Sequence, residues 1–499
     1  MFNLSDSIKY FYRQLSRIKI LFLKYPTSQG AWSLSEKQIK DFNKERYHGP
    51  KKLVCYNPFV NLYFNSRGQA VVCCRNQDTV LGSYPEQKIK EIWFGQKASE
   101  LREKLSSNDL SMGCQYCYHQ IATSRFHGLP SMHADRYAVT KTTYPKILEL
   151  ELSNKCNLQC IMCSGIVSSS IRKCRENLPE LESKYDGQFV EQLKEFLPYA
   201  REIKFYGGEP FLIDLYYKIW DELLRIKSKA KLHVVTNGTV LNDKVRNYLK
   251  KLNFTITVSF DSLDKDTFES IRVGADFDKV KANILEYNNL LGGKGLSLSL
   301  TPMQINCREV PAVIDFCNSL NATINLSFLE NPRKFAIWIM SSYELKELEN
   351  FYRSYVFMPA SSVNAKYNFE VYRQFVSQIT KYHQINKSLE EEYFQNLPDE
   401  ISSREFVGDF FERMLRKNVI YENQKNIIKN LIEEISSKLD MHEKRVYWGN
   451  IYNYLFSRGE EDLKNLTKNG FDENKVKSVL LSLTKMKDVY PKSYKDFNI

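Results

Sequence analysis

The sequence predicts an α/β protein: parallel strands alternating with helices, preceded by a small cysteine-rich module and followed by a helical region. Three observations support this. Six apolar strand patterns alternate with helical patterns between residues 145 and 332. Eight of the eleven cysteines fall between positions 55 and 163, and helical patterns dominate beyond residue 332. Strands spaced in this way imply βα units that form a barrel or partial barrel.

Residues 1–50 form the first predicted segment. Its main feature is an amphipathic helix over 4–24, whose apolar residues recur every three or four positions. They are Leu4, Ile8, Phe11, Leu15, Ile18 and Phe22. Because its opposite face is basic, this helix either packs on the body of the protein or docks on a membrane surface or a partner.

Charge and composition narrow the functional classes. The chain has 499 residues and a formal charge of +12, of which +9 lies in residues 1–140. A basic first third could meet an acidic partner, but the charge is modest for this length and does not favour nucleic-acid binding. No run of about 18 apolar residues occurs, so no membrane-spanning helix is expected. No signal peptide is recognised, and we expect a cytoplasmic protein whose clustered cysteines serve metal or redox chemistry.

Residues 51–140 form the predicted cysteine-rich module. Val60, Leu62 and Phe64 alternate with other residues, and an apolar run over 70–72 follows a turn at Gly68, which predicts a β-hairpin. Cys55 lies before the first strand of this hairpin, and Cys73 ends the second. A helix is expected over 89–105, and Cys114 and Cys117 close the module.

Residues 141–332 form the predicted barrel, and 333–499 a helical domain of unknown role. Chemistry in such barrels sits at the carboxyl ends of the strands. The six strands are expected at 147–152, 203–206, 232–235, 254–260, 296–300 and 324–328.

Three cysteines follow the first barrel strand directly, at positions 156, 160 and 163. Three thiolates can hold three irons of a 4Fe–4S cluster and leave the fourth iron open to a small molecule. Zinc is the alternative, although structural zinc prefers four protein ligands. Cys156, Cys160 and Cys163 are therefore candidate metal ligands.

A second motif, Tyr206-Gly207-Gly208-Glu209-Pro210, ends the next strand, and its first glycine lies 44 residues after Cys163. Together the two motifs resemble those of the radical S-adenosylmethionine (SAM) enzymes. The resemblance covers about residues 145–330 and implies a partial (βα)6 TIM-like barrel, a SAM-binding 4Fe–4S cluster and SAM itself. In that family the Gly-Gly-Glu-Pro segment, here Gly207, Gly208, Glu209 and Pro210, binds the amino group of SAM.

The same resemblance implies further cofactor contacts, all at strand ends or in the cysteine loop. Asn237 ends the third strand, and Ser259 and Asp261 end the fourth. Met162, beside the third cysteine, holds the position that the family places near the adenine. Gln304 and Asn306 after the fifth strand are additional candidates. Each of these could instead be a helix cap or turn residue.

The second cysteine set, Cys55, Cys73, Cys114 and Cys117, resembles the SPASM or twitch module, which holds auxiliary iron–sulfur clusters. Two departures matter: a full SPASM module has seven cysteines and two clusters, and it usually follows the barrel. We therefore expect one auxiliary 4Fe–4S cluster, with a four-cysteine zinc site as the alternative. If Cys117 were not a ligand, an open iron could bind substrate.

The remaining cysteines and two histidines receive minor roles. Adjacent strand residues point to opposite faces, so Cys74 should not share the ligand role of Cys73 and is expected to be buried. Cys174 and Cys317 are expected to pack in helices. Cys307, just past the fifth strand, is a candidate hydrogen-atom donor. His119 and His127 lie near the second cysteine pair and are not favoured as ligands.

The resemblance implies an enzyme that cleaves SAM to a 5′-deoxyadenosyl radical and removes a hydrogen atom from a substrate. It favours a peptide or protein substrate; the alternative is dehydrogenation or epimerisation of a small molecule such as a sugar. A non-catalytic iron–sulfur or zinc scaffold is a third hypothesis. An electron donor of the flavodoxin or ferredoxin type is the expected partner.

Overall fold

The computed structural model describes residues 32–124, 126, 129–396, 400–417, 419–457 and 471–484. The predicted helix over 4–24 and His127 lie outside these residues. The chain divides into two compact units. The first comprises the described residues up to Phe335 together with Val356–Arg373, and the second comprises Ala336–Tyr355 and the described residues from Gln374 onward.

A nine-stranded sheet in the described residues organises the first unit, in the order β3-β2-β1-β4-β5-β6-β7-β8-β9. Strands β4 to β9 pair in parallel in chain order, which confirms the predicted βα barrel region. The strands are β1 (Asn61–Phe64), β2 (Gln69–Val71), β3 (Gly82–Ser83), β4 (Ile147–Leu150), β5 (Glu202–Phe205), β6 (Lys231–Thr236), β7 (Phe254–Ser259), β8 (Leu296–Leu300) and β9 (Thr323–Leu326).

The cysteine-rich module joins this sheet through its hairpin. Strands β1 and β2 pair in antiparallel register, with Tyr63 opposite Val71, and Gly68 adopts a φ of 85° in the turn. Because glycine has no Cβ, it takes this left-handed conformation without strain. Strand β1 then pairs in parallel with β4, so one sheet runs from the module into the barrel.

Helices of the module surround the hairpin. They are α2 (Glu36–Lys44), α3 (Asn57–Val60), α4 (Ile89–Phe94), α5 (Gln96–Ser106), α6 (Gln115–Ala122), α7 (Pro130–His133) and the 3₁₀ turn η1 (Ala134–Tyr137). The single helix expected over 89–105 is wrong. Gly95, with extended backbone angles, ends α4 and caps the start of α5.

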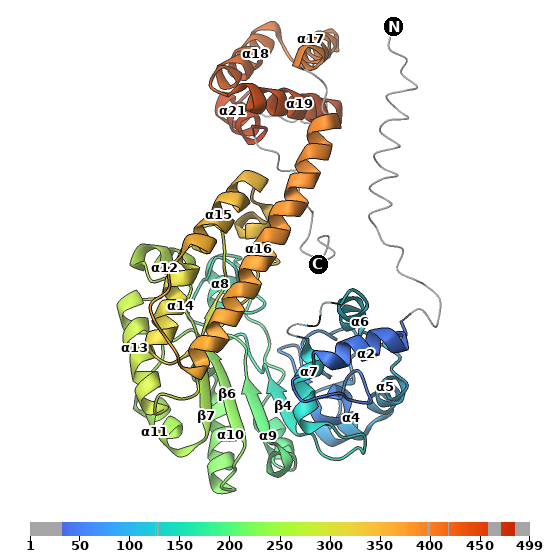
Figure 1. Ribbon diagram of the computed structural model, residues 1–499, viewed down its shortest axis with the longest axis vertical. Helices are drawn as coiled ribbons and strands as arrows, with labels where there is room; N and C mark the ends of the chain where they lie inside the picture. The colour runs from blue at the N-terminus through green and yellow to red at the C-terminus, as the bar shows by residue number, and fades with distance from the viewer. Residues whose placement is uncertain are drawn as a thin grey trace. The chain divides into compact units, whose positions relative to one another are not determined.

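The barrel helices pack on the apolar face of the sheet. Phe205 of β5 contacts the rings of Tyr216 and Trp220 in α10. Figure 1 shows the helices and strands of the chain with their labels. The helical elements are α8 (Ser169–Cys174), α9 (Gly187–Leu193), α10 (Asp214–Arg225), α11 (Asp243–Lys251), α12 (Lys265–Ile271), α13 (Phe277–Leu290) and α14 (Val310–Ser319), with short turns η2 (Leu197–Tyr199), η3 (Pro210–Leu212), η4 (Cys307–Glu309) and η5 (Arg333–Phe335).

The second unit is helical, as its sequence predicts. Its elements are η6 (Ile337–Ile339), α15 (Ser342–Ser354), the part of α16 (Val363–Asn396) from Gln374 onward, α17 (Glu400–Arg416), α18 (Glu422–Ser437), α19 (Met441–Ser457) and α21 (Glu473–Ser482). Helices α17, α18, α19 and α21 share an apolar core that includes Phe410, Ile432 and Trp448. None of the helices in the described ranges is long and apolar enough to cross a membrane.

Candidate active site

The three-cysteine loop begins where β4 ends, and two neighbouring segments fix its shape. The Ser168 hydroxyl donates to the Leu158 carbonyl at 2.7 Å, and the Cys156 amide donates to the Ser169 hydroxyl at 3.1 Å. The backbone amides of Gln159 and Ile161 donate to the carbonyls of Val273 and Ile271. The backbone around Cys160 is therefore held by the start of α8, by the last residue of α12 and by the chain just after it.

The structure brings the thiols of this loop together. A hydrogen bond between the thiols of Cys160 and Cys163 lowers the pKa of Cys160 and raises that of Cys163. Burial raises the pKa of Cys156, which also interacts with Cys160. Three converging thiols fit a 4Fe–4S cluster, because each thiolate ligates a different iron.

The Gly207–Gly208 pair lets the end of β5 approach this loop closely. Gly207 and Gly208 have φ values of 83° and 39°. A Cβ on Gly208 would lie 2.2 Å from the Lys155 carbonyl oxygen, and one on Gly207 would lie 2.5 Å from that of Ser153. The next amide, that of Glu209, donates to the Lys155 carbonyl at 2.8 Å. The two motifs therefore form one continuous site.

The Glu209 carboxylate is fully buried and holds neighbouring strand ends together. It accepts hydrogen bonds from the Thr236 hydroxyl at 2.8 Å, from the backbone amide of Asn237 at 2.7 Å and from the backbone amide of Phe211 at 3.1 Å. Burial raises the pKa of Glu209 to about 7, against the lowering effect of these donors. Three protein donors leave limited acceptor capacity for the amino group of SAM.

Replacing Gly208 by alanine should weaken SAM binding about tenfold or more, because relieving the clash costs roughly 1–3 kcal/mol. Anaerobic calorimetric titration with SAM measures the effect. Gly187→Ala is the matched control, since a Cβ there meets nothing within 4 Å. Equal affinities for both variants and the unmodified chain would contradict this account of Gly208.

The other predicted SAM contacts have the following surroundings. The Asn237 amide nitrogen lies 3.9 Å from the Cys156 sulfur and donates to Asn157 at 3.0 Å. Ser259 ends β7 half-buried, and Pro210 begins η3. Met162 packs against an apolar cluster that includes Ile271 and Met303. Their contact with SAM remains a prediction.

Asp261 is engaged within the protein. Its buried carboxylate forms an ion pair with Arg272 at 2.7 Å and accepts from the Thr301 amide at 2.7 Å. Asn306 donates to the Asp261 carbonyl at 2.8 Å, so this candidate also supports the strand end. Gln304 donates through its amide to the Lys334 carbonyl at 3.3 Å. The Cys307 thiol is buried in η4 and donates to the Gln304 carbonyl at 3.5 Å; its role as a hydrogen-atom donor remains a prediction.

The second cysteine set faces one cavity. Cys55, Cys73, Cys114 and Cys117 all line it, together with Asn57, Arg75 and Asn76. The Asn76 amide donates to the Cys114 sulfur at 3.4 Å. Burial first, and the neighbouring thiols second, raise the pKa of Cys55, Cys73 and Cys114 to about 12.

This arrangement fits a bound iron–sulfur cluster, whose positive irons would favour the thiolate form of all four cysteines. In the described part of the chain, no three His, Cys, Asp or Glu side chains are close enough to hold a single metal ion. The four thiols line one shared cavity, and a cluster with one thiolate on each iron requires such an arrangement.

Two cysteine predictions are wrong. Cys74 is exposed rather than buried, because strand β2 ends at Val71 and Cys74 lies beyond it, in the turn between the bridged residues Cys73 and Asn76. It lies within electrostatic reach of Glu149 and Lys204 on the barrel strands. Cys174 ends α8 and is also exposed, whereas Cys317 is buried in α14 as predicted. His119 packs edge-on against Trp32 and does not line the cysteine cavity.

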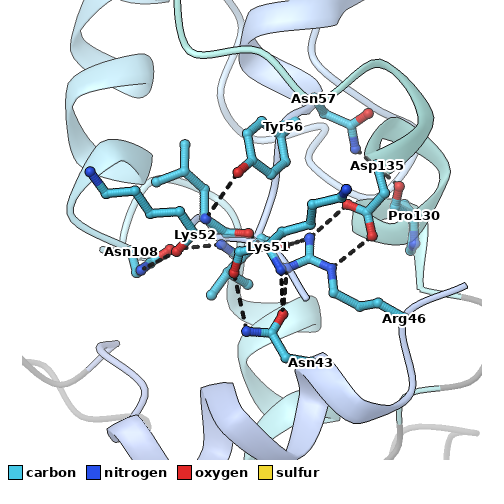
Figure 2. A network of polar contacts seen from close by, with 11 residues as sticks. Asn43, Arg46, Lys51, Lys52, Tyr56, Asn57, Asn108, Pro130 and Asp135 are labelled. Carbon is cyan, nitrogen blue, oxygen red and sulfur yellow. Dashed lines mark hydrogen bonds and ion pairs between the residues drawn. The ribbon is translucent and has the colours of Figure 1, made fainter. Parts of the chain in front are cut away.

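A buried polar network positions the segment that leads into Cys55 (Figure 2). Arg46 donates to both carboxylate oxygens of Asp135 at 2.7 Å, and both side chains are fully buried. The same guanidinium donates to the carbonyls of Leu53 and Val54 at 2.8 and 3.1 Å. Asn108 accepts from the Val54 amide at 2.7 Å. The backbone before Cys55 is thereby tied to three separate parts of the module.

Asp135→Ala should destabilise the protein by about 3–5 kcal/mol, because it leaves the Arg46 charge buried without its partner. Chemical denaturation measures the change in the free energy of unfolding, with the loss of tertiary structure monitored by near-ultraviolet circular dichroism. Asp278→Ala is the control, because its ion pair with Lys265 is exposed. A similar small change in both variants would show that the network does not stabilise the module.

The inner face of the barrel carries polar residues that the sequence analysis did not single out. In adjacent strands, Glu149 lies beside Lys204, Lys204 beside His233 and His233 beside Thr255. Glu149 and Lys204 form an ion pair at 3.6 Å with little solvent exposure. Burial lowers the pKa of His233 to about 4. The signal was the alternation of polar with apolar residues in these strands.

Comparison with known families identifies both predicted modules. Residues 150–302 match the Radical SAM superfamily, and residues 55–118 match the SPASM iron–sulfur cluster-binding domain. The chain therefore contains a radical SAM domain and, before it, a SPASM domain. The resemblances drawn from the two cysteine sets are confirmed at this level.

Curated relatives match over part of their length. GTP 3′,8-cyclase of Clostridium botulinum is 30% identical over 162 residues, covering 32% of this chain and 46% of the relative. The radical SAM cyclopropyl synthase TigE of Paramaledivibacter caminithermalis is 28% identical over 172 residues, covering 29% and 35%. The chain thus spans about half or less of these two relatives.

Among solved structures, anSMEcpe with bound S-adenosylmethionine is 18% identical, with a TM-score of 0.33 over 42% of this chain and 59% of that chain. SuiB of Streptococcus suis bound to the precursor peptide SuiA is 14% identical, with a TM-score of 0.33 over 52% and 59%.

Proposed function

We propose that this chain, a radical SAM enzyme with an N-terminal SPASM domain, cleaves SAM reductively in order to modify a peptide or protein. The observation that carries the proposal is the close contact between the three-cysteine loop and the Gly207–Gly208 segment. A 4Fe–4S cluster on Cys156, Cys160 and Cys163 would supply the electron that splits SAM into methionine and a 5′-deoxyadenosyl radical, which takes a hydrogen atom from the substrate.

The protein's own residues position the reactants and exclude water. Ser168 and Ser169 fix the cysteine loop, and Asn237 lies beside the Cys156 sulfur. Met162 of the loop packs against an apolar cluster that includes Met303. Polar groups on the inner face of the barrel, Glu149 and Lys204 among them, are available to orient a substrate.

The SPASM domain supports a second redox centre on Cys55, Cys73, Cys114 and Cys117. Four protein thiolates leave no iron open to substrate, so a cluster there would transfer electrons rather than bind the reactant. We propose that this cluster accepts an electron from the substrate radical. We also propose that this module spans residues 51–140 and that the barrel spans residues 141–332.

The substrate class has two candidates. A peptide or protein is favoured by the combination of a radical SAM core with a SPASM domain. A small molecule is the alternative, and the similarity to GTP 3′,8-cyclases, which are named for a nucleotide substrate, supports it. We further propose a flavodoxin- or ferredoxin-type electron donor and a cytoplasmic setting, where the eleven cysteines of the chain would stay reduced.

The test is formation of 5′-deoxyadenosine by the anaerobically reconstituted chain with SAM and dithionite. The assay is run alone, with a peptide encoded by a short reading frame beside the gene, and with GTP. The proposal predicts that the peptide stimulates cleavage and changes in mass. Stimulation by GTP alone would transfer the assignment to small-molecule chemistry, and no cleavage under any condition would reject SAM cleavage itself.

A further inference from the structure

Arg272 is a buried cation beside the cysteines of the radical SAM loop. Its guanidinium Nη1 lies 3.8 Å from the Cys160 sulfur, and its Nη2 lies 2.7 Å from Asp261 Oδ2. The Arg272 side chain is 9% exposed and that of Asp261 is 0% exposed. An arginine cannot lose its proton in a protein, so this is a permanent positive charge.

Backbone hydrogen bonds place Arg272 next to Cys160. The carbonyls of Ile271 and Val273, on either side of Arg272, accept hydrogen bonds from the amides of Ile161 and Gln159, on either side of Cys160. Two segments more than a hundred residues apart in the chain are thereby held in fixed register. The Asp261 ion pair then fixes the direction of the side chain.

The electrostatic effect of this charge has a definite sign. The reduction potential of an iron–sulfur cluster depends on the net charge nearby, on hydrogen bonds to its sulfurs and on solvent exposure. A nearby cation stabilises the reduced, more negative form of the cluster. Because Arg272 is buried, its charge is poorly screened by solvent.

We propose that Arg272, positioned by Asp261, raises the reduction potential of the cluster held by Cys156, Cys160 and Cys163. This inference rests on the proposed function, because it requires a cluster on that loop. The step concerned is a one-electron reduction of the cluster by an external flavodoxin- or ferredoxin-type donor. Arg272 thus makes delivery of the electron for SAM cleavage easier, and Asp261 is a positioning residue.

Arg175 offers a matched control on the same loop. Its guanidinium donates to the carbonyls of Cys163 at 2.6 Å and Cys160 at 3.4 Å, but the residue is exposed to solvent. It therefore touches the backbone of the two cysteines, whereas Arg272 approaches a sulfur. Water should screen the Arg175 charge, so its removal should leave the potential nearly unchanged.

The experiment is an EPR-monitored redox titration of the reconstituted full chain, following the cluster signal that changes on addition of SAM. For Arg272→Gln we expect the equilibrium constant for reduction to fall at least tenfold, a shift of about 59 mV for a one-electron couple. Arg272→Lys should recover most of this loss. Asp261→Asn, which removes a negative charge but keeps Arg272, should raise the potential, while Arg175→Gln should not change it.

The directions separate an electrostatic role from a structural one. A structural role predicts that Arg272→Gln and Asp261→Asn lower the potential together, and that result would overturn the proposal. An unchanged potential in Arg272→Gln at full iron content would also overturn it. If Arg272→Gln fails to bind the cluster, the Asp261→Asn variant provides the test. A reduction potential in Asp261→Asn that is not higher than that of the unmodified chain would reject the proposal. The iron content of the unmodified chain tests the proposed function separately. If that chain holds no SAM-sensitive cluster, the premise of this inference, a cluster on the three-cysteine loop, is lost.

Discussion

Replacing Cys160 by alanine is expected to abolish formation of 5′-deoxyadenosine from SAM. Cys160 lies at the centre of the three-cysteine loop, where it contacts Cys163, interacts with Cys156 and faces Arg272. Without its thiolate, the loop keeps only two iron ligands, and a cluster with one open iron needs three. The loss should therefore be complete at the detection limit of mass spectrometry.

The matched control is Cys174→Ala, which removes an exposed thiol eleven residues after Cys163. This variant should retain both SAM cleavage and the full iron content. Retained cleavage in Cys160→Ala would refute the assignment of the loop as the SAM-cleaving site.

Replacing Cys114 by alanine should separate SAM cleavage from substrate turnover. Cys114 lines the cavity of the SPASM domain and accepts a hydrogen bond from Asn76. It is not part of the three-cysteine loop. The first cluster should therefore survive, and 5′-deoxyadenosine should still form without substrate. Product should fall below detection, because the substrate radical loses its electron acceptor.

Cys74→Ala is the control for this second experiment. Cys74 is next to the proposed ligand Cys73 but does not line the cavity, so its loss should not reduce the iron content. If Cys114→Ala also abolished SAM cleavage, or if it lost the SAM-sensitive cluster, the division of the cysteines into two independent sites would be wrong.

The sequence predicts the parts of this protein that depend on local pattern. Strand β4 and the three-cysteine loop, and strand β5 and Gly207–Gly208, each follow one another in the chain. Parallel pairing of β4 with β5 then brings the two motifs together. The same local reasoning separates Cys73, which lines the cavity, from Cys74, which does not, although strand β2 ends at Val71, before both residues.

What the sequence does not predict depends on distant partners. Arg46 and Asp135 are 89 positions apart, and Arg272 and Cys160 are 112 positions apart. Asp261 was predicted as a SAM contact from its place at a strand end, and only the fold shows that Arg272 occupies its carboxylate.

The most direct test of the central claim is the iron content per chain after anaerobic reconstitution. The measurement compares the unmodified chain with a variant in which Cys156, Cys160 and Cys163 are all alanine. Two four-iron clusters predict about eight irons in the unmodified chain and about four in the variant. About four irons in the unmodified chain and none in the variant would contradict the account, because the SPASM cysteines would then hold no cluster.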